Sequence, residues 1–89
     1  MYAVLVAVDI APGRYDESIR ALDEYIIPMC KGAPGFMRGT WFGDQVSGNS
    51  LMVFDSEKSA RLMAEEVRAD PDAPITITGT HVYQVEREA

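Results

Sequence analysis

His81 is the only histidine among the 89 residues of this sequence. Imidazole is the side chain that ordinarily changes its charge near neutral pH, so a histidine in a pocket can act as a general base or orient a ligand. His81 is therefore the candidate catalytic residue. The alternative is a structural or interface histidine that is held by hydrogen bonds and takes no part in chemistry.

Four further side chains are candidates for holding a ligand: Tyr15, Arg38, Trp41 and Tyr83. Trp41 is the only tryptophan, and its ring could stack on a flat ligand or anchor a protein interface. The glycines beside it are typical of close approach by another chain, so we expect the anchor. Arg38 could bind an anionic ligand or form an interface salt bridge. The two tyrosines could line a pocket or pack at its rim.

Signatures of several common enzyme classes are missing from the sequence. It has no phosphate-binding loop, no dinucleotide-binding glycine pattern, no cysteine or histidine pair at metal-ligand spacing and no serine nucleophile elbow. These absences argue against NAD, ATP, structural zinc and hydrolase chemistry, and we expect neither a metal nor another cofactor. The single cysteine, Cys30, excludes an intramolecular disulfide and is expected to be buried or half-buried.

The composition predicts a small acidic protein that needs a partner for its apolar surface. Hydrophobic residues make up 47% of the chain, and the formal net charge is -6. This charge argues against nucleic acid and anionic membranes as partners, because both require a basic surface. One small core cannot bury so much apolar surface, so we expect a homodimer. No secretory signal and no apolar run of the ~20 residues that span a bilayer is visible, which predicts a cytoplasmic protein.

The candidate residues must be positioned by six elements that the hydrophobic periodicity predicts. In order, these are a strand, a helix, two strands, a helix and a strand, over residues 2–10, 15–31, 36–43, 50–55, 56–68 and 75–86. The first strand is apolar on both faces, as is typical of a central strand. Residues 43–49 have the composition of a hairpin loop. Pro28 should kink the first helix or end it early, because proline removes a helix hydrogen bond.

Alternation along two strands predicts which residues share a face. One face of the strand over residues 36–43 is expected to carry Phe36, Arg38, Thr40 and Phe42. Its other face is expected to carry Met37, Gly39, Trp41 and Gly43. The apolar face of the last strand is expected to comprise Ile75, Ile77, Gly79, His81, Tyr83 and Val85. His81 and Tyr83 would then lie beside the two isoleucines.

The order of the elements predicts an α+β fold with the ferredoxin-like βαββαβ arrangement, as a single domain over residues 1–89. Right-handed crossovers give a four-stranded antiparallel sheet of order 4-1-3-2, with both helices on one face. The other face is too apolar to meet water. We therefore expect the sheets of two chains to pack against each other.

Four stretches carry a resemblance to a known superfamily: VAVDIAPGRYDESIRAL, APGF, VFDSEKSARLMAEEV and VYQV. With them, nearly the whole chain resembles the dimeric α/β barrel superfamily, and in particular its antibiotic-biosynthesis-monooxygenase-like and stress-responsive members. The resemblance implies a dimer of ferredoxin-like protomers. The superfamily includes cofactor-independent quinol monooxygenases, haem-degrading monooxygenases, small isomerases and ligand-sensing domains, so the fold alone does not select a function.

The resemblance argues against one of these activities. The haem degraders use an asparagine on the first strand and a histidine in the region of the second helix, with a tryptophan nearby. Here residues 2–10 contain no asparagine and residues 56–68 contain no histidine. Trp41 lies on the second predicted strand and His81 on the last. Haem degradation by that route is therefore not expected.

Two classes of function remain open. The first is a non-catalytic dimer that binds a small ligand or has a structural role. The second is a cofactor-independent monooxygenase or isomerase that acts on a small aromatic or quinonoid compound. A cavity of a few hundred cubic ångströms between sheet and helices, with His81 or a tyrosine pointing into it, would favour the enzyme. A fully packed layer would favour the first class.

Overall fold

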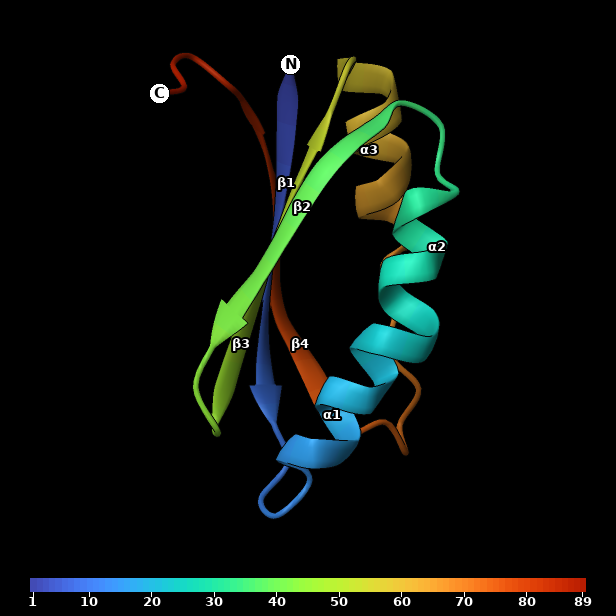
Figure 1. Ribbon diagram of the computed structural model, residues 1–89, viewed down its shortest axis with the longest axis vertical. Helices are drawn as coiled ribbons and strands as arrows, with labels where there is room; N and C mark the ends of the chain where they lie inside the picture. The colour runs from blue at the N-terminus through green and yellow to red at the C-terminus, as the bar shows by residue number, and fades with distance from the viewer.

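Strand β1 (Tyr2–Ile10) lies inside a four-stranded antiparallel sheet in the computed structural model, which describes residues 1–89. It pairs with β3 (Ser47–Phe54) on one side and β4 (Ile75–Gln84) on the other. The edge strand β2 (Phe36–Gly43) pairs with β3. The resulting order, β2-β3-β1-β4, is the predicted order 4-1-3-2 counted from the opposite edge, so the predicted topology is confirmed (Figure 1).

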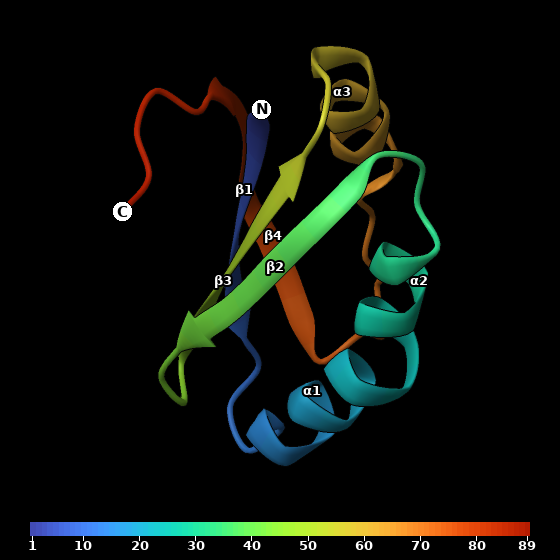
Figure 2. The same cartoon turned by 45° about the horizontal axis from the view of Figure 1, so that its top comes forward.

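The helices all lie on one face of the sheet (Figures 1 and 2). The first helical segment runs continuously through α1 (Tyr15–Ala21), η1 (Leu22–Ile26) and α2 (Ile27–Lys31), and α3 (Glu57–Glu66) lies above α2 in Figure 1. The core between the layers consists of Val4, Val6, Cys30, Met52, Phe54, Ala60 and Met63. None of the helices has the length and apolar character needed to cross a membrane.

The first helical segment passes through Pro28 by way of a π-helical turn. Proline has no N–H to donate to the carbonyl of Glu24, so the regular α-helical pattern cannot continue through it. The turn η1 absorbs this break, and its N–H···O bond runs from Ile27 back to the carbonyl of Leu22. After it the helix continues to Lys31. The predicted interruption therefore lies one turn before the proline, and the helix does not end there.

A β-bulge in β2 changes which residues share its faces. The register with β3 shifts between Phe36 and Arg38, so Met37 has no partner of its own. Phe36 pairs with Phe54 on the helix-facing side, and their rings meet edge to face with centroids 5.8 Å apart. Arg38 pairs with Val53 on the opposite side, which we call the outer face of the sheet. The prediction that Phe36 and Arg38 share a face is therefore wrong, because the bulge adds one residue to the alternation.

A second irregularity has the same effect on β4. Ile77 pairs with Val8, whereas Gly79 pairs with Ala7, so one residue of β4 is unpaired between them. Ile75 and Ile77 consequently face the helices. His81 and Tyr83, which follow the bulge, lie on the outer face. The single apolar face predicted for residues 75–85 is wrong for this reason.

The hairpin between β2 and β3 is tighter than its composition predicts. β3 begins at Ser47, so only residues 44–46 form the loop. Asp44 closes it, because its Oδ1 atom accepts hydrogen bonds from the backbone N–H of Val46 at 2.9 Å and of Ser47 at 2.8 Å. The Ser47 hydroxyl donates to the same oxygen at 3.1 Å. These backbone bonds hold the pKa of the Asp44 carboxyl below its ordinary value of 3.8.

Replacing Asp44 with asparagine is expected to lower stability slightly at neutral pH and to flatten the acid limb of the stability curve. A carboxyl with a lowered folded-state pKa stabilises the protein above its unfolded value of 3.8 and loses this effect as the pH falls through the folded value. Urea unfolding between pH 7 and pH 2 measures the difference. Asp23→Asn is the control, and an identical pH dependence for both variants would contradict the role of Asp44.

Candidate functional site

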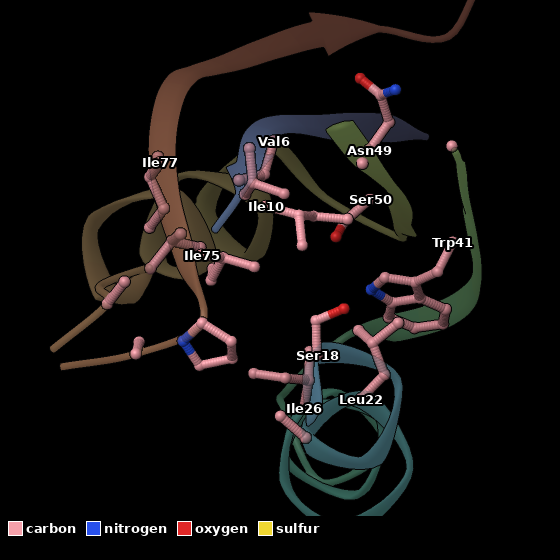
Figure 3. A pocket seen from close by; sticks show the side chains of 18 of the residues that line it. Val6, Ile10, Ser18, Leu22, Ile26, Trp41, Asn49, Ser50, Ile75 and Ile77 are labelled. Carbon is pink, nitrogen blue, oxygen red and sulfur yellow. The ribbon is translucent and has the colours of Figure 1, made fainter. Parts of the chain in front are cut away.

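A cavity of about 650 Å³ lies between the helix-facing side of the sheet and the helical segment α1–η1–α2. Twenty of its 31 lining residues are hydrophobic. Val6 and Ile10 of β1, Ile75 and Ile77 of β4, and Leu22 and Ile26 of the π turn supply much of the wall (Figure 3). Its volume and apolar wall are typical of a site for a small organic molecule. Side chains therefore do not fill the space between the sheet and this helical segment.

Three polar side chains converge at one end of this pocket. Trp41 and Ser50 pair across β2 and β3, and both face the helices. Ser18 reaches the same region from α1 (Figure 3). The Nε1–H of Trp41 is buried and has no hydrogen-bond partner within the protein. An unpaired buried donor costs about 1–3 kcal/mol, so this N–H gains from any oxygen that a ligand brings to it.

The local sequence fixes how the indole ring of Trp41 lies. A Cβ atom at Gly39 would come within 2.6 Å of the ring atom Cη2, so the ring occupies the space above this glycine. Gly39 and Trp41 share a face of β2, and the ring therefore lies back along its own strand. The glycine makes room for this ring and not for another chain. The prediction of Trp41 as an anchor on the sheet's interface is wrong, because Trp41 faces the helices.

Ser18 is a buried polar residue on the pocket-facing side of α1. Its hydroxyl donates to the backbone carbonyl of Tyr15 at 2.6 Å. This bond occupies the hydroxyl proton and leaves oxygen lone pairs for a ligand. Ser18 therefore acts toward the pocket as an acceptor, whereas Trp41 acts as a donor.

The structure divides the five predicted site residues between the two faces of the sheet. Tyr15 and Trp41 line the pocket. His81 pairs with Leu5 and Tyr83 with Ala3 on the outer face, where their rings stack with centroids 6.0 Å apart. Arg38 is also on this face and forms an ion pair with Glu88. The pocket therefore contains no histidine.

Ser18 and Ser50 were missed by sequence reasoning, although each left a signal. Ser18 follows Tyr15 by three residues and precedes Leu22 by four, so it interrupts the apolar stripe of the helix. Ser50 precedes the buried residues Met52 and Phe54 on the same face of β3. A polar residue within an apolar stripe needs a hydrogen-bond partner, and a ligand can supply one.

Charged groups around the pocket are mostly acidic. Its lining includes Asp44, Glu66 and Asp70, against the single cation Arg68. All four side chains are exposed, so they act on an incoming ligand at long range and are screened by salt. Burial raises the pKa of the Cys30 thiol, which lies deeper in the wall and donates to Met52 Sδ at 3.5 Å. The pocket offers no cluster of positive charge for an anion.

Neither a family model nor a curated protein matches the sequence. Among solved structures, the haem degrader MhuD from Mycobacterium tuberculosis, with two haems bound in its active site, superposes with a TM-score of 0.73 and 14% identity. The match covers 100% of this chain and 99% of MhuD. The chain has the fold of MhuD. A mutant of MhuD with two manganese protoporphyrin IX molecules per active site matches with a TM-score of 0.67 and 14% identity, over 100% of this chain and 98% of that one.

The match to MhuD confirms the predicted βαββαβ fold. The pocket residues nevertheless do not fit a haem. Haem iron is held by histidine, cysteine thiolate, methionine together with histidine, or tyrosine. Here the histidine is on the outer face, and burial raises the pKa of the Cys30 thiol, which disfavours the thiolate. The acidic lining also disfavours the two propionates of haem.

Proposed function

We propose that the protein is a cofactor-independent monooxygenase that acts on a flat aromatic phenol or enol in this pocket. The observation that carries the proposal is the apolar cavity that ends at the unpaired indole N–H of Trp41. The shared fold with a haem-degrading protein supports a site in this layer. The misfit with haem favours a substrate that supplies its own electrons over one that needs bound iron.

Trp41 would stabilise the anionic form of such a substrate. Its Nε1 atom is buried, so a small side-chain adjustment must open it to the pocket before its N–H donates to a phenolate oxygen. The Ser50 hydroxyl, on the paired position of β3, provides a second donor. Hydrogen bonds to the charged form lower the pKa of the bound hydroxyl. The substrate proton passes to solvent water.

The substrate anion then reacts with dioxygen directly. It transfers one electron to dioxygen, and the resulting radical and superoxide combine to form a carbon–oxygen bond. Protonation gives a hydroperoxide, which loses water as the O–O and C–H bonds break. The net change is R₂CH₂ + O₂ → R₂C=O + H₂O, in which the substrate supplies all the electrons. The protein's part is to bind the enol, hold its oxygen on Trp41 and exclude bulk water from the ring.

Incubation with anthrone under ¹⁸O₂ tests this proposal, because the enol of anthrone is a flat tricyclic phenol. The protein is expected to speed formation of anthraquinone with one labelled oxygen, compared with buffer alone. The rate should rise with pH as the bound enol ionises, since no histidine lines the pocket to act as a base. Mass spectrometry of the product measures both effects, and a rate equal to that in buffer would overturn the proposal.

Non-catalytic binding of a small aromatic ligand is the second candidate function. The observation that favours it is the chemistry of the three converging groups, since an indole and two hydroxyls are poor bases near neutral pH. A complex with anthrone or its enol that forms without turnover would support this candidate. The two functions share the pocket and differ only in the fate of the ligand.

We further propose that the protein forms a homodimer through the outer face of the sheet. Met37 and Phe42 of β2, Leu51 of β3 and Tyr83 of β4 are large apolar or aromatic side chains that this face exposes. An exposed apolar patch that extends across the sheet from β2 to β4 is typical of an interface. Because the pocket opens on the other side of the sheet, two sheets packed in this way leave both pockets accessible.

A further inference from the structure

The polar end of the pocket combines one obligatory donor with one obligatory acceptor. The Trp41 Nε1–H can only donate, and it has no partner within the protein. While it donates its proton to the Tyr15 carbonyl at 2.6 Å, the Ser18 hydroxyl offers a ligand only its oxygen lone pairs. Both groups point toward the same part of the pocket (Figure 3). A ligand satisfies both when one group on it accepts and donates at once.

A hydroxyl group meets this requirement, and a carbonyl or an ether does not. The hydroxyl oxygen accepts from Trp41, while its proton goes to Ser18. A carbonyl or ether oxygen accepts from Trp41 but offers Ser18 no proton. A carboxylate presents only lone pairs to Ser18 and must lose its water in an apolar cavity, which is costly.

We propose that Trp41 and Ser18 together select a flat aromatic ligand that carries a hydroxyl group at its edge and binds in its neutral form. Trp41 recognises the oxygen, and Ser18 distinguishes a hydroxyl from other oxygen functions. The proposal rests on the proposed function in two respects: the ligand binds in this pocket, and the ligand is aromatic. It does not depend on whether the ligand is oxidised.

A series of naphthalene derivatives tests this selection, with affinity measured by isothermal titration calorimetry. The probes are 1-naphthol, 1-methoxynaphthalene, naphthalene and 1-naphthoate, at a pH at which 1-naphthol is neutral. The wild-type protein is expected to bind 1-naphthol about 3- to 10-fold more tightly than 1-methoxynaphthalene, which lacks the bond to Ser18. Naphthalene should bind about 3- to 10-fold more weakly again, because it lacks the bond to Trp41. The naphthoate should bind more weakly than the naphthol.

Two variants assign each preference to its residue. Ser18→Ala is expected to remove the difference between 1-naphthol and 1-methoxynaphthalene while keeping the preference of both over naphthalene. Trp41→Phe keeps an aromatic ring and is expected to reduce the difference between 1-methoxynaphthalene and naphthalene, with only the Ser50 hydroxyl left to donate. Ser59→Ala, on α3 and outside the pocket lining, should leave the order of affinities unchanged.

The outcomes separate this inference from the proposed function. Equal wild-type affinity for all three neutral probes would overturn the selection by Trp41 and Ser18, although the pocket would still be an aromatic site. Equal affinity of Ser18→Ala and wild type for 1-naphthol would overturn the role of Ser18, even if Trp41→Phe failed to fold. Absence of binding by every probe would overturn both proposals, whereas ordered binding without oxygenation of anthrone would overturn only the enzymatic one.

Discussion

Replacing Ser50 with phenylalanine is expected to abolish ligand binding in the pocket while leaving the protein at least as stable as the wild type. Ser50 lies on β3, and its side chain points into the cavity (Figure 3). A phenyl ring there would fill space next to Trp41 that the ligand needs. Burying the ring contributes up to about 1.5–3 kcal/mol of stability, and phenylalanine suits a strand.

Calorimetry with 1-naphthol and thermal unfolding measure the two expected effects of Ser50→Phe. Ser50→Ala is the matched control, because it removes the hydroxyl and keeps the cavity open. It should lose only one hydrogen bond, or about 3- to 10-fold in affinity. Undiminished binding by Ser50→Phe would show that the ligand site lies elsewhere. A large loss of stability would show that this part of the layer is already filled.

Replacing Leu51 with aspartate is expected to convert the protein from a dimer into a monomer. Leu51 is the neighbour of Ser50 but faces the other way, and it pairs with Leu5 and Thr40 on the outer face. An unpaired carboxylate buried in an apolar interface costs about 3–5 kcal/mol. At about 1.4 kcal/mol for each tenfold change, the dimer should dissociate at least about 100-fold more readily.

Light scattering coupled to gel filtration, repeated over a range of concentrations, measures the change in Leu51→Asp. The control is Leu62→Asp on α3, because Leu62 has a similar exposed fraction, 43% against 38%, but lies in the helix layer. This control should remain a dimer. A wild-type protein that is monomeric at micromolar concentration would disprove the dimer, and a dimeric Leu51→Asp would show that the interface lies on another surface.

The parts of the fold that follow from long, uninterrupted patterns could be predicted from the sequence. The first strand was predicted with its observed bounds, since Val4 and Val6 belong to one apolar stripe that needs a core on the helix side. The start of α3 was also predicted, because Ser56 is a good cap and its hydroxyl accepts from the backbone N–H of Ser59. Such local signals determine element type and order, and so the topology.

The candidate site could be predicted only in part, because two single-residue bulges are invisible in a pattern of alternation. Each bulge reverses the faces of the residues beyond it. The bulge in β4 moves His81 away from Ile77 and out of the pocket. The bulge in β2 separates Phe36 from Arg38. The unpaired N–H of Trp41 could not be predicted from the sequence either, because its lack of a partner depends on residues from three different elements.

The π turn at Leu22–Ile26 allows this helical segment to lose one residue without a change in how its two ends are oriented. A π turn holds one residue more than an α-helical turn, so it behaves as a one-residue insertion in an α-helix. Removing one residue from it would restore regular α-helical hydrogen bonding up to the proline. Ser18, before the turn, and Cys30, after it, would keep their rotational positions on the helix. A chain one residue shorter here could therefore retain both the pocket wall and the core contact of Cys30.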